Sequence, residues 1–218
     1  TPKEIIKTAL KCAKLGVSIV HIHQRDGDGN PTWERQVFVK IIAGIREKND
    51  QIVINATTSG RLWSEFEKRS ECLDLEKDLR PDMASLTVGS MNFIREESVS
   101  SPEMIERLAL KMKERGIKPE LEVFEPGMVH KAKYLMDKGI IDNERAYFNI
   151  LLGSLGTSPL EASVLGTFVN MLPEGAVWAV AGIGAYQLDA NVAGLAFGGH
   201  VRVGLEDNIY LDREKQKL

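Results

Sequence analysis

The chain has 218 residues, of which 43% are hydrophobic and 27% are charged, a composition typical of a globular domain with its own core. Its 28 basic residues stand against 31 acidic ones, and a net charge of −3 gives no reason to expect nucleic acid or an anionic membrane as a partner. No apolar run approaches the roughly 20 residues that span a bilayer, and no signal peptide opens the chain, so we expect a cytoplasmic protein.

A helix is predicted at the start of the chain. Thr1 is placed to act as its N-cap, Pro2 fits the first helical position, and Glu4 completes a capping box. Apolar residues follow at helical spacing on one face until Gly16, a residue type that commonly ends helices.

Short apolar runs then alternate with longer amphipathic stretches. The runs predict strands near 17–23, 52–57, 83–87, 118–124, 147–153, 177–181 and 200–204. Helical patterns separate them, including Trp33–Lys48, Pro102–Arg115, Gly127–Lys138 and Pro159–Leu172. The strand starts lie 23 to 35 residues apart, which is the length of a βα unit in a parallel sheet.

This alternation predicts an α/β fold of the (β/α)8 TIM-barrel type, in a single domain over residues 1–218. Eight strands close such a barrel and seven are visible here, so we expect the domain to be incomplete at both ends, without its first strand and C-terminal helix. The alternative is an open doubly wound sheet. That fold usually has a Gly-rich phosphate-binding turn after its first strand, and no such turn follows His23.

Two histidines lie at the end of the first visible strand. Side chains alternate along a strand, so His21 and His23 share one face and can reach one metal ion together. Active sites of (β/α)8 barrels lie at this end of the strands. The competing interpretation is a pair of ordinary buried or loop histidines, which the spacing and position disfavour.

Two acids follow the last visible strand. Glu206 and Asp207 stand at its end, where one carboxylate completes a site of two histidines and one acid that suits Zn(II) and also Fe(II). The other carboxylate is then available as a general base. The competing interpretation is a helix N-terminus decorated with acids.

Arg202 is predicted to point into the barrel interior, where a guanidinium needs an ionic partner. The run at 118–124 offers two, because Glu120 and Glu122 fall on the same face of their strand. We expect these acids to pair with Arg202 or to act in the site.

Hydroxyl and glycine residues mark the ends of two more strands, in Asn55–Gly60 and Met83–Gly89. They suit hydrogen bonding to a substrate carboxylate or oxyanion. An amidohydrolase-type site would need further histidines at later strand ends. The two that remain are His130, in a helical pattern, and His200, at the wrong end of its strand, so this class is excluded.

With these segments identified, the chain resembles the beta-keto acid cleavage enzymes, a zinc-dependent family that includes 3-keto-5-aminohexanoate cleavage enzyme. The matching stretches follow the family order and are His21–Asp26, Arg80–Phe93, Pro119–Phe124, Ala179–Gly184 and Gly199–Asn208.

The resemblance implies a homotetrameric barrel with one Zn²⁺ per subunit, bound by His21, His23 and Glu206. It also implies a reaction in which a beta-keto acid and acetyl-CoA, the co-substrate, yield acetoacetate and a new acyl-CoA through an enolate and a retro-Claisen step. Asp207 would be the base, and Arg202 and Glu122 would hold it. The positions that bind the carboxylate end of the substrate would be Thr57, Gly60 and Ser85.

The sequence departs from the family near Gly153–Ser158, where relatives tend to have a Gly-Gly turn, and at Ala185, where they tend to have a basic residue. Asn149 has no assigned role. Two other functions remain open: a metal-dependent lyase or aldolase that needs no CoA acceptor, and a non-catalytic barrel with a structural metal.

Overall fold

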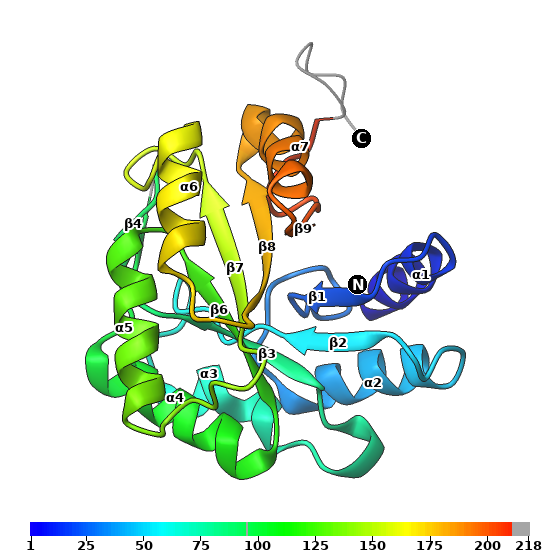
Figure 1. The fold of residues 1–218 in the computed structure, drawn as a ribbon. Coiled ribbons are helices and arrows are strands. Elements are labelled where there is room, and N and C mark those ends of the chain that lie inside the picture. The colour runs from blue at the N-terminus through cyan, green and yellow to red at the C-terminus, as the bar shows by residue number, and fades with distance from the viewer. Residues whose placement is uncertain (95, 211–218) are drawn as a thin grey trace. The chain divides into compact units, whose positions relative to one another are not determined.

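The computed structural model describes residues 1–94 and 96–210 (Figure 1). Its main sheet has seven strands that follow one another in chain order: β1 (Ile19–Ile22), β2 (Val53–Ala56), β3 (Met83–Thr87), β6 (Lys118–Val123), β7 (Tyr147–Leu152), β8 (Val177–Gly182) and β9 (His200–Val201). The pairs β1–β2, β2–β3, β7–β8 and β8–β9 are parallel. This sequential order belongs to the (β/α)8 barrel, whereas a doubly wound sheet reverses its strand order at a switch point.

Helices connect the strands. The α-helices are α1 (Pro2–Lys14), α2 (Arg35–Arg46), α3 (Phe66–Ser70), α4 (Pro102–Arg115), α5 (Pro126–Asp137), α6 (Ala162–Met171) and α7 (Gln187–Ala196). Three 3₁₀ helices are η1 (Glu71–Asp74), η2 (Lys77–Leu79) and η3 (Gly184–Tyr186). The short strands β4 (Met91–Asn92) and β5 (Glu97–Ser98) pair with each other in an antiparallel hairpin.

All seven predicted strands are present, and so is the predicted first helix with its Thr1–Glu4 capping box. The last strand is shorter than predicted. It ends at Val201, although Arg202 still donates its backbone N–H to Val180, and the chain then turns at Gly204. The segment after Tyr210, where the sequence suggests a final helix, lies outside the described residues. Among the described residues, no helix is long and apolar enough to cross a membrane.

The chain divides into two compact units. The first comprises Thr1–Leu86 and Arg107–Glu120, and the second comprises Thr87–Glu106 and Leu121–Leu218. The strands β3 and β6 contribute residues to both units. Each unit is described by itself below.

The core of the first unit forms around α2. Its apolar residues recur at spacings of three and four, so they share one face, and Phe38, Ile41, Ile42 and Ile45 are fully buried. Burial of side chains of this size stabilises the fold by about 2 kcal/mol each. Asp82 joins α2 to the sheet, since its carboxylate accepts from the Ile54 backbone at 2.7 Å and from Arg46 at 2.9 and 3.0 Å.

The core of the second unit forms around the β7–β8 pair, which Figure 1 shows side by side. Nearly every residue of both strands is buried, as expected for parallel strands covered on both faces. Close backbone packing continues to β9: a Cβ added at Gly199 would lie 2.4 Å from the Trp178 ring. The packing therefore fixes where the chain leaves β9 and enters the segment that carries Arg202.

Candidate metal and substrate site

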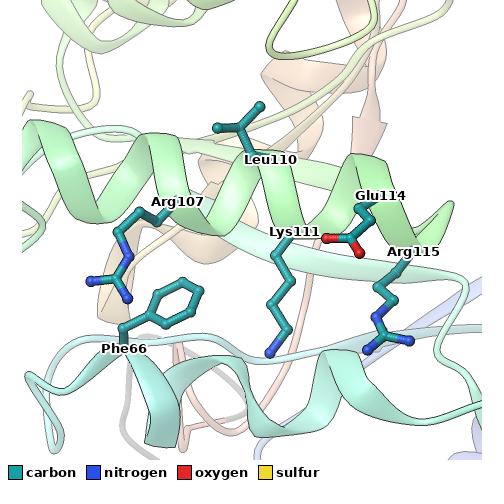
Figure 2. A pocket seen from close by; sticks show the side chains of 6 residues that line it. All are labelled: Phe66, Arg107, Leu110, Lys111, Glu114 and Arg115. Carbon is teal, nitrogen blue, oxygen red and sulfur yellow. The ribbon is translucent and has the colours of Figure 1, made fainter.

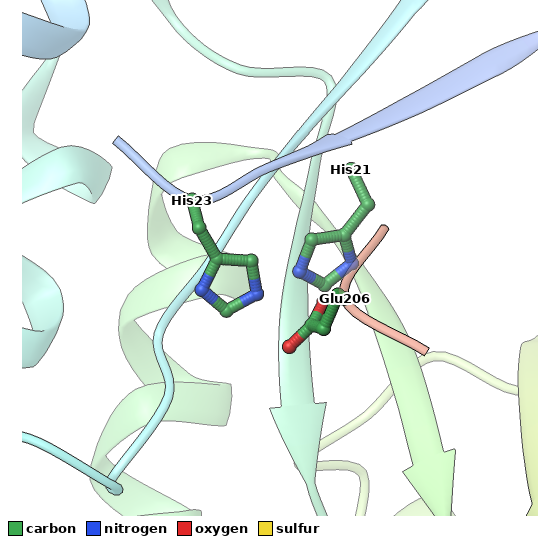
Figure 3. A group of neighbouring side chains, drawn as sticks. All are labelled: His21, His23 and Glu206. Carbon is green, nitrogen blue, oxygen red and sulfur yellow. The ribbon is translucent and has the colours of Figure 1, made fainter. Parts of the chain in front are cut away.

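The histidine pair lies in the first unit. His21 is in β1 and His23 follows its end, so the two side chains leave the same face of the strand. Their rings are stacked, with centroids 5.0 Å apart and planes 15° from parallel. Figure 3 shows the two imidazoles directed the same way; it also draws Glu206, which belongs to the second unit. The predicted pairing of the two histidines is therefore present.

His21 is held from the side of its Nδ1 atom. This atom lies 2.8 Å from Glu120 Oε2 and 3.2 Å from Asn55 Nδ2, and the Asn55 amide also donates to Glu120 Oε2 at 2.6 Å. The strand register explains the contact, because His21 is paired with Asn55 across β1 and β2. Glu120 thus bonds to His21 and Asn55, while Glu122 is the acid that pairs with Arg202.

Of the hydroxyl residues predicted to bind substrate, Thr57 follows the end of β2 and Ser85 lies within β3, also in the first unit. Ser85 Oγ accepts the Thr58 backbone N–H at 3.1 Å, and the Thr58 hydroxyl donates to the Ser85 carbonyl. Thr57 is the residue before Thr58, and its backbone N–H donates to the Ile22 carbonyl of β1. Gly60 is partly exposed in the same turn. The buried Arg69 donates to the Thr58 carbonyl at 2.9 Å, and burial lowers the pKa of its guanidinium to about 10.

The acid cluster lies in the second unit, around Arg202. Its guanidinium donates two hydrogen bonds to the Asp207 carboxylate, Nε to Oδ2 at 3.0 Å and Nη2 to Oδ1 at 3.2 Å. It also donates to Glu122 Oε1 at 3.1 Å and to Glu206 Oε2 at 2.9 Å. The side chains of Arg202 and Asp207 are 11% and 3% exposed, so the bonds between these two are largely shielded from solvent, whereas the bond to Glu206 is exposed. The predicted pairing of Arg202 with Glu122 is confirmed.

The backbone around the cluster explains how these side chains are held. The backbone N–H groups of Asp207 and Asn208 both donate to the Gly204 carbonyl, which makes a tight turn. Gly184, with a positive φ of 60°, donates its N–H to the Asp207 carbonyl at 2.7 Å. At the opposite end of the cluster, Glu122 Oε2 accepts the Thr87 hydroxyl at 2.8 Å. Arg202 and the carboxylates it binds are therefore positioned by packed backbone.

The donor set fits a divalent metal of zinc type. The imidazoles of His21 and His23 in the first unit are borderline-soft ligands, and the carboxylate of Glu206 in the second unit is a hard ligand, and Zn²⁺ accepts both types. The carboxylate that holds His21 Nδ1 directs the other ring nitrogen, Nε2, away from Glu120, an arrangement common for metal-bound histidines.

A separate surface hollow lies beside α4 in the first unit (Figure 2). It is lined by Phe66, Arg107, Leu110, Lys111, Glu114 and Arg115. Its cations are engaged within the fold, because Lys111 and Arg115 both bind Asp74 at 2.7 and 2.9 Å. Arg107 stacks over the Phe66 ring at 4.0 Å. Ion pairs and stacking brace α4 here, and the residues predicted to act in the site lie elsewhere.

A family model described as beta-keto acid cleavage enzyme matches residues 1–217. This chain belongs to that family.

Curated beta-keto acid cleavage enzymes and their relatives align along nearly the whole chain. A 3-keto-5-aminohexanoate cleavage enzyme from Fusobacterium nucleatum is 36% identical over 218 residues, covering 98% of this chain and 76% of that protein. A 3-oxoadipate:acetyl-CoA acetyltransferase from Cupriavidus necator is 34% identical over 98% of this chain and 74% of that protein. Relatives with such different names share the family and differ in the keto acid.

The fold is confirmed by solved structures. The apo structure of ObcA matches with a TM-score of 0.84 at 18% identity, covering 99% of this chain and 56% of that one. The chain thus spans a little over half of the ObcA chain. A 3-dehydroquinate dehydratase from Enterococcus faecalis matches with a TM-score of 0.60 at 13% identity. The chain has the (β/α)8 fold predicted for it.

Some contacts of the predicted site residues could not be identified from the sequence. Asn55, Thr58 and Thr87 bond to predicted site residues, and none of them was singled out for that role. All three lie within the two stretches noted for their hydroxyl and glycine content, Asn55–Gly60 and Met83–Gly89. What identifies them is the register between neighbouring strands, which the sequence does not display.

Proposed function

We propose that this protein is a zinc-dependent beta-keto acid cleavage enzyme. It converts a beta-keto acid and acetyl-CoA into acetoacetate and a new acyl-CoA. Family membership supports the reaction class, and the names of two relatives include acetyl-CoA as reactant. The observation that carries the proposal is the bidentate grip of Arg202 on the buried carboxylate of Asp207.

The proposed metal site consists of His21, His23 and Glu206. Charge supports a cation near the last of these, because one guanidinium in the second unit binds three carboxylates, those of Glu122, Glu206 and Asp207. Three negative charges on one positive charge leave an excess of negative charge that a divalent ion would offset. When bound, Zn²⁺ supplies Lewis acidity that polarises the keto group of the substrate.

Asp207 is the proposed base. Its carboxylate removes a proton from the carbon between the keto and carboxylate groups of the substrate, and that carbon attacks the acetyl thioester. The released CoA thiolate then adds to the original keto carbon and breaks its bond to the carbon that attacked the thioester, which keeps the electron pair. Asp207 returns the proton to that carbon, so the base is regenerated and atoms balance. Arg202 keeps the carboxylate oriented and ionised between turnovers.

The ends of β2 and β3 are proposed to bind the carboxylate of the substrate. Ser85 uses its oxygen to accept the Thr58 N–H, so its hydroxyl hydrogen is available to donate to an anion. Thr57 and Gly60 belong to the turn that this bond closes. Hydrogen-bond donors fixed in this way recognise a carboxylate without losing side-chain freedom on binding.

The wider biological setting is also part of the proposal. We propose a cytoplasmic homotetramer that uses small-molecule substrates and binds neither nucleic acid nor membrane. Support comes from the nearly balanced charge of the chain, −3 in 218 residues.

The proposal is tested with purified protein in two assays. Metal analysis is expected to find about one zinc per chain. Acetoacetate is expected to form from a panel of beta-keto acids when acetyl-CoA is supplied, and Asp207→Asn is expected to lower the rate by at least about 100-fold by removing the base. Zinc content should be unchanged in this variant, which shows that its site is intact.

Two results would contradict the proposal. Turnover that proceeds at the same rate without acetyl-CoA would indicate a metal-dependent lyase or aldolase. Protein that binds zinc through four protein ligands and has no activity on any acid would indicate a structural metal.

A further inference from the structure

The contact between His21 and Glu120 is short, and both side chains are largely shielded from solvent. The two atoms, Nδ1 and Oε2, lie 2.8 Å apart, and the side chains are 12% and 3% exposed. A buried carboxylate without partners would be costly, and Asn55 supplies its second bond at 2.6 Å. The buried carboxylate of Glu120 therefore has a specific partner, the imidazole of His21.

The geometry also determines which nitrogen of His21 carries a proton. Nδ1 has two neighbours, and it cannot donate to Glu120 and accept from Asn55 at once. The bond to the carboxylate is shorter, 2.8 Å against 3.2 Å, and it is charge-assisted. The Asn55 amide has a better acceptor in Glu120 Oε2. Nδ1 is therefore the donor, and in the neutral ring the lone pair lies on Nε2.

We propose that Glu120 is a positioning residue of the metal site, which holds His21 in the Nδ1–H form so that Nε2 is its ligand atom. This inference rests on the proposed function of His21 as a metal ligand. Glu120 does not contact the metal in this account. It fixes the rotation of the imidazole about its side-chain bonds, and it makes Nε2 a stronger electron donor, as carboxylates behind metal-bound histidines do. Asn55 in turn orients the Glu120 carboxylate, because its amide donates a hydrogen bond to Oε2.

The test compares Glu120→Gln with the wild type in zinc affinity, measured by competition with a chelator. Glutamine has the same shape, but its neutral amide is a weaker acceptor for Nδ1–H. The expected result is an affinity about 10–100-fold lower, with one zinc still bound per chain at saturation. Glu114→Gln, which removes an exposed acid from α4 in the same unit, is the matched control and should leave the affinity unchanged. Circular dichroism of each variant checks that the fold is intact.

A second measurement separates this inference from the proposed function. Nitrogen-15 NMR of the metal-free protein reports which ring nitrogen of His21 is protonated. The wild type is expected to show Nδ1–H, and Glu120→Gln is expected to shift the population toward Nε2–H. If the wild type binds no zinc, the proposed function fails, while the NMR comparison still decides whether Glu120 sets the tautomer.

Two outcomes would overturn the role given to Glu120. Unchanged zinc affinity together with an unchanged tautomer would mean that the acid only fills space in the core. Loss of the bound zinc at every zinc concentration, in a variant that remains folded, would mean that Glu120 is itself a ligand. Glu120→Asp, which retains the charge on a shorter side chain, should recover part of the affinity together with part of the Nδ1–H population of His21.

Discussion

Arg202 shows how one partly buried residue organises a set of charged side chains. Its planar guanidinium has five donors, and four of its hydrogen bonds reach the carboxylates of Glu122, Glu206 and Asp207. Lysine could not reproduce this geometry, because an ammonium group lacks the rigid fork that binds a carboxylate at two points. The sequence predicted that Arg202 needs an acidic partner, since a lone guanidinium is costly to bury. It did not predict that a single arginine would bind three acids.

Cys72 is a buried residue beside the proposed substrate positions. Its thiol donates to the Thr57 carbonyl at 3.6 Å, and burial raises its pKa to about 12, from an ordinary value of 9.0. Between these two values the unfolded chain loses its thiol proton while the folded protein keeps it. The thiol therefore contributes stability that is complete below pH 9 and is lost progressively as the pH rises toward 12.

This linkage predicts that the melting temperature falls above pH 9, and that Cys72→Ala makes the fall less steep. Thermal unfolding followed by circular dichroism from pH 8 to 10.5 measures it. Cys12→Ala, at the other free cysteine, is the control. Equal slopes in Cys72→Ala and the wild type would refute the prediction.

At the scale of elements, the alternation of strands and helices could be read from the sequence because it depends on local patterns. Apolar runs and capping residues predicted every strand of the main sheet and the first helix. The β4–β5 hairpin was missed because two residues per strand carry no periodicity. Helix α7 was not among the helices named from the sequence, because QLDANVAGLA leaves large apolar side chains exposed and gives only a weak amphipathic pattern.

The candidate site was only partly predictable from the sequence, because local patterns reveal only contacts between residues that are close in the chain. His21 and His23 are two residues apart, so their shared face follows from strand geometry. The bond between His21 and Glu120 joins residues 99 positions apart, and it depends on how β1, β2 and β6 are staggered. Stagger is set by packing across the sheet, which no pattern along one strand reveals.

Glycine positions near the last strands allow a test of this packing. A Cβ added at Gly182 would lie 2.2 Å from the Tyr186 carbonyl oxygen, a backbone atom that cannot rotate away. Gly182→Ala should therefore lower the free energy of unfolding by about 1–3 kcal/mol. In Gly166→Ala the new methyl group meets no atom within 4 Å, and the helix α6 should gain up to about 1 kcal/mol.

Urea unfolding of the two variants provides the measurement. Because both variants replace glycine by alanine, a difference between their free energies of unfolding reports the space and backbone conformation at each position. Equal stability of Gly182→Ala and the wild type would mean that the turn after β8 is looser than described.

For the whole molecule, family membership is the finding that supports the proposed reaction class. The family model covers 217 of the 218 residues, so the assignment does not depend on any single motif. The relatives act on acids with different tails, including 3-keto-5-aminohexanoate and 3-oxoadipate, according to their names. The shared part of those substrates is the beta-keto acid group, and the proposed base and metal site act on that part.

The account is tested most directly by following carbon from acetyl-CoA into products. With acetyl-CoA labelled with carbon-13 in both acetyl carbons, a carbon–carbon bond forms between the substrate and the labelled acetyl group. The account predicts doubly labelled acetoacetate and an unlabelled new acyl-CoA in equal amounts, by mass spectrometry, and formation of both at least about 100-fold slower in Asp207→Asn. Unlabelled acetoacetate, or label retained in the new acyl-CoA, would contradict it.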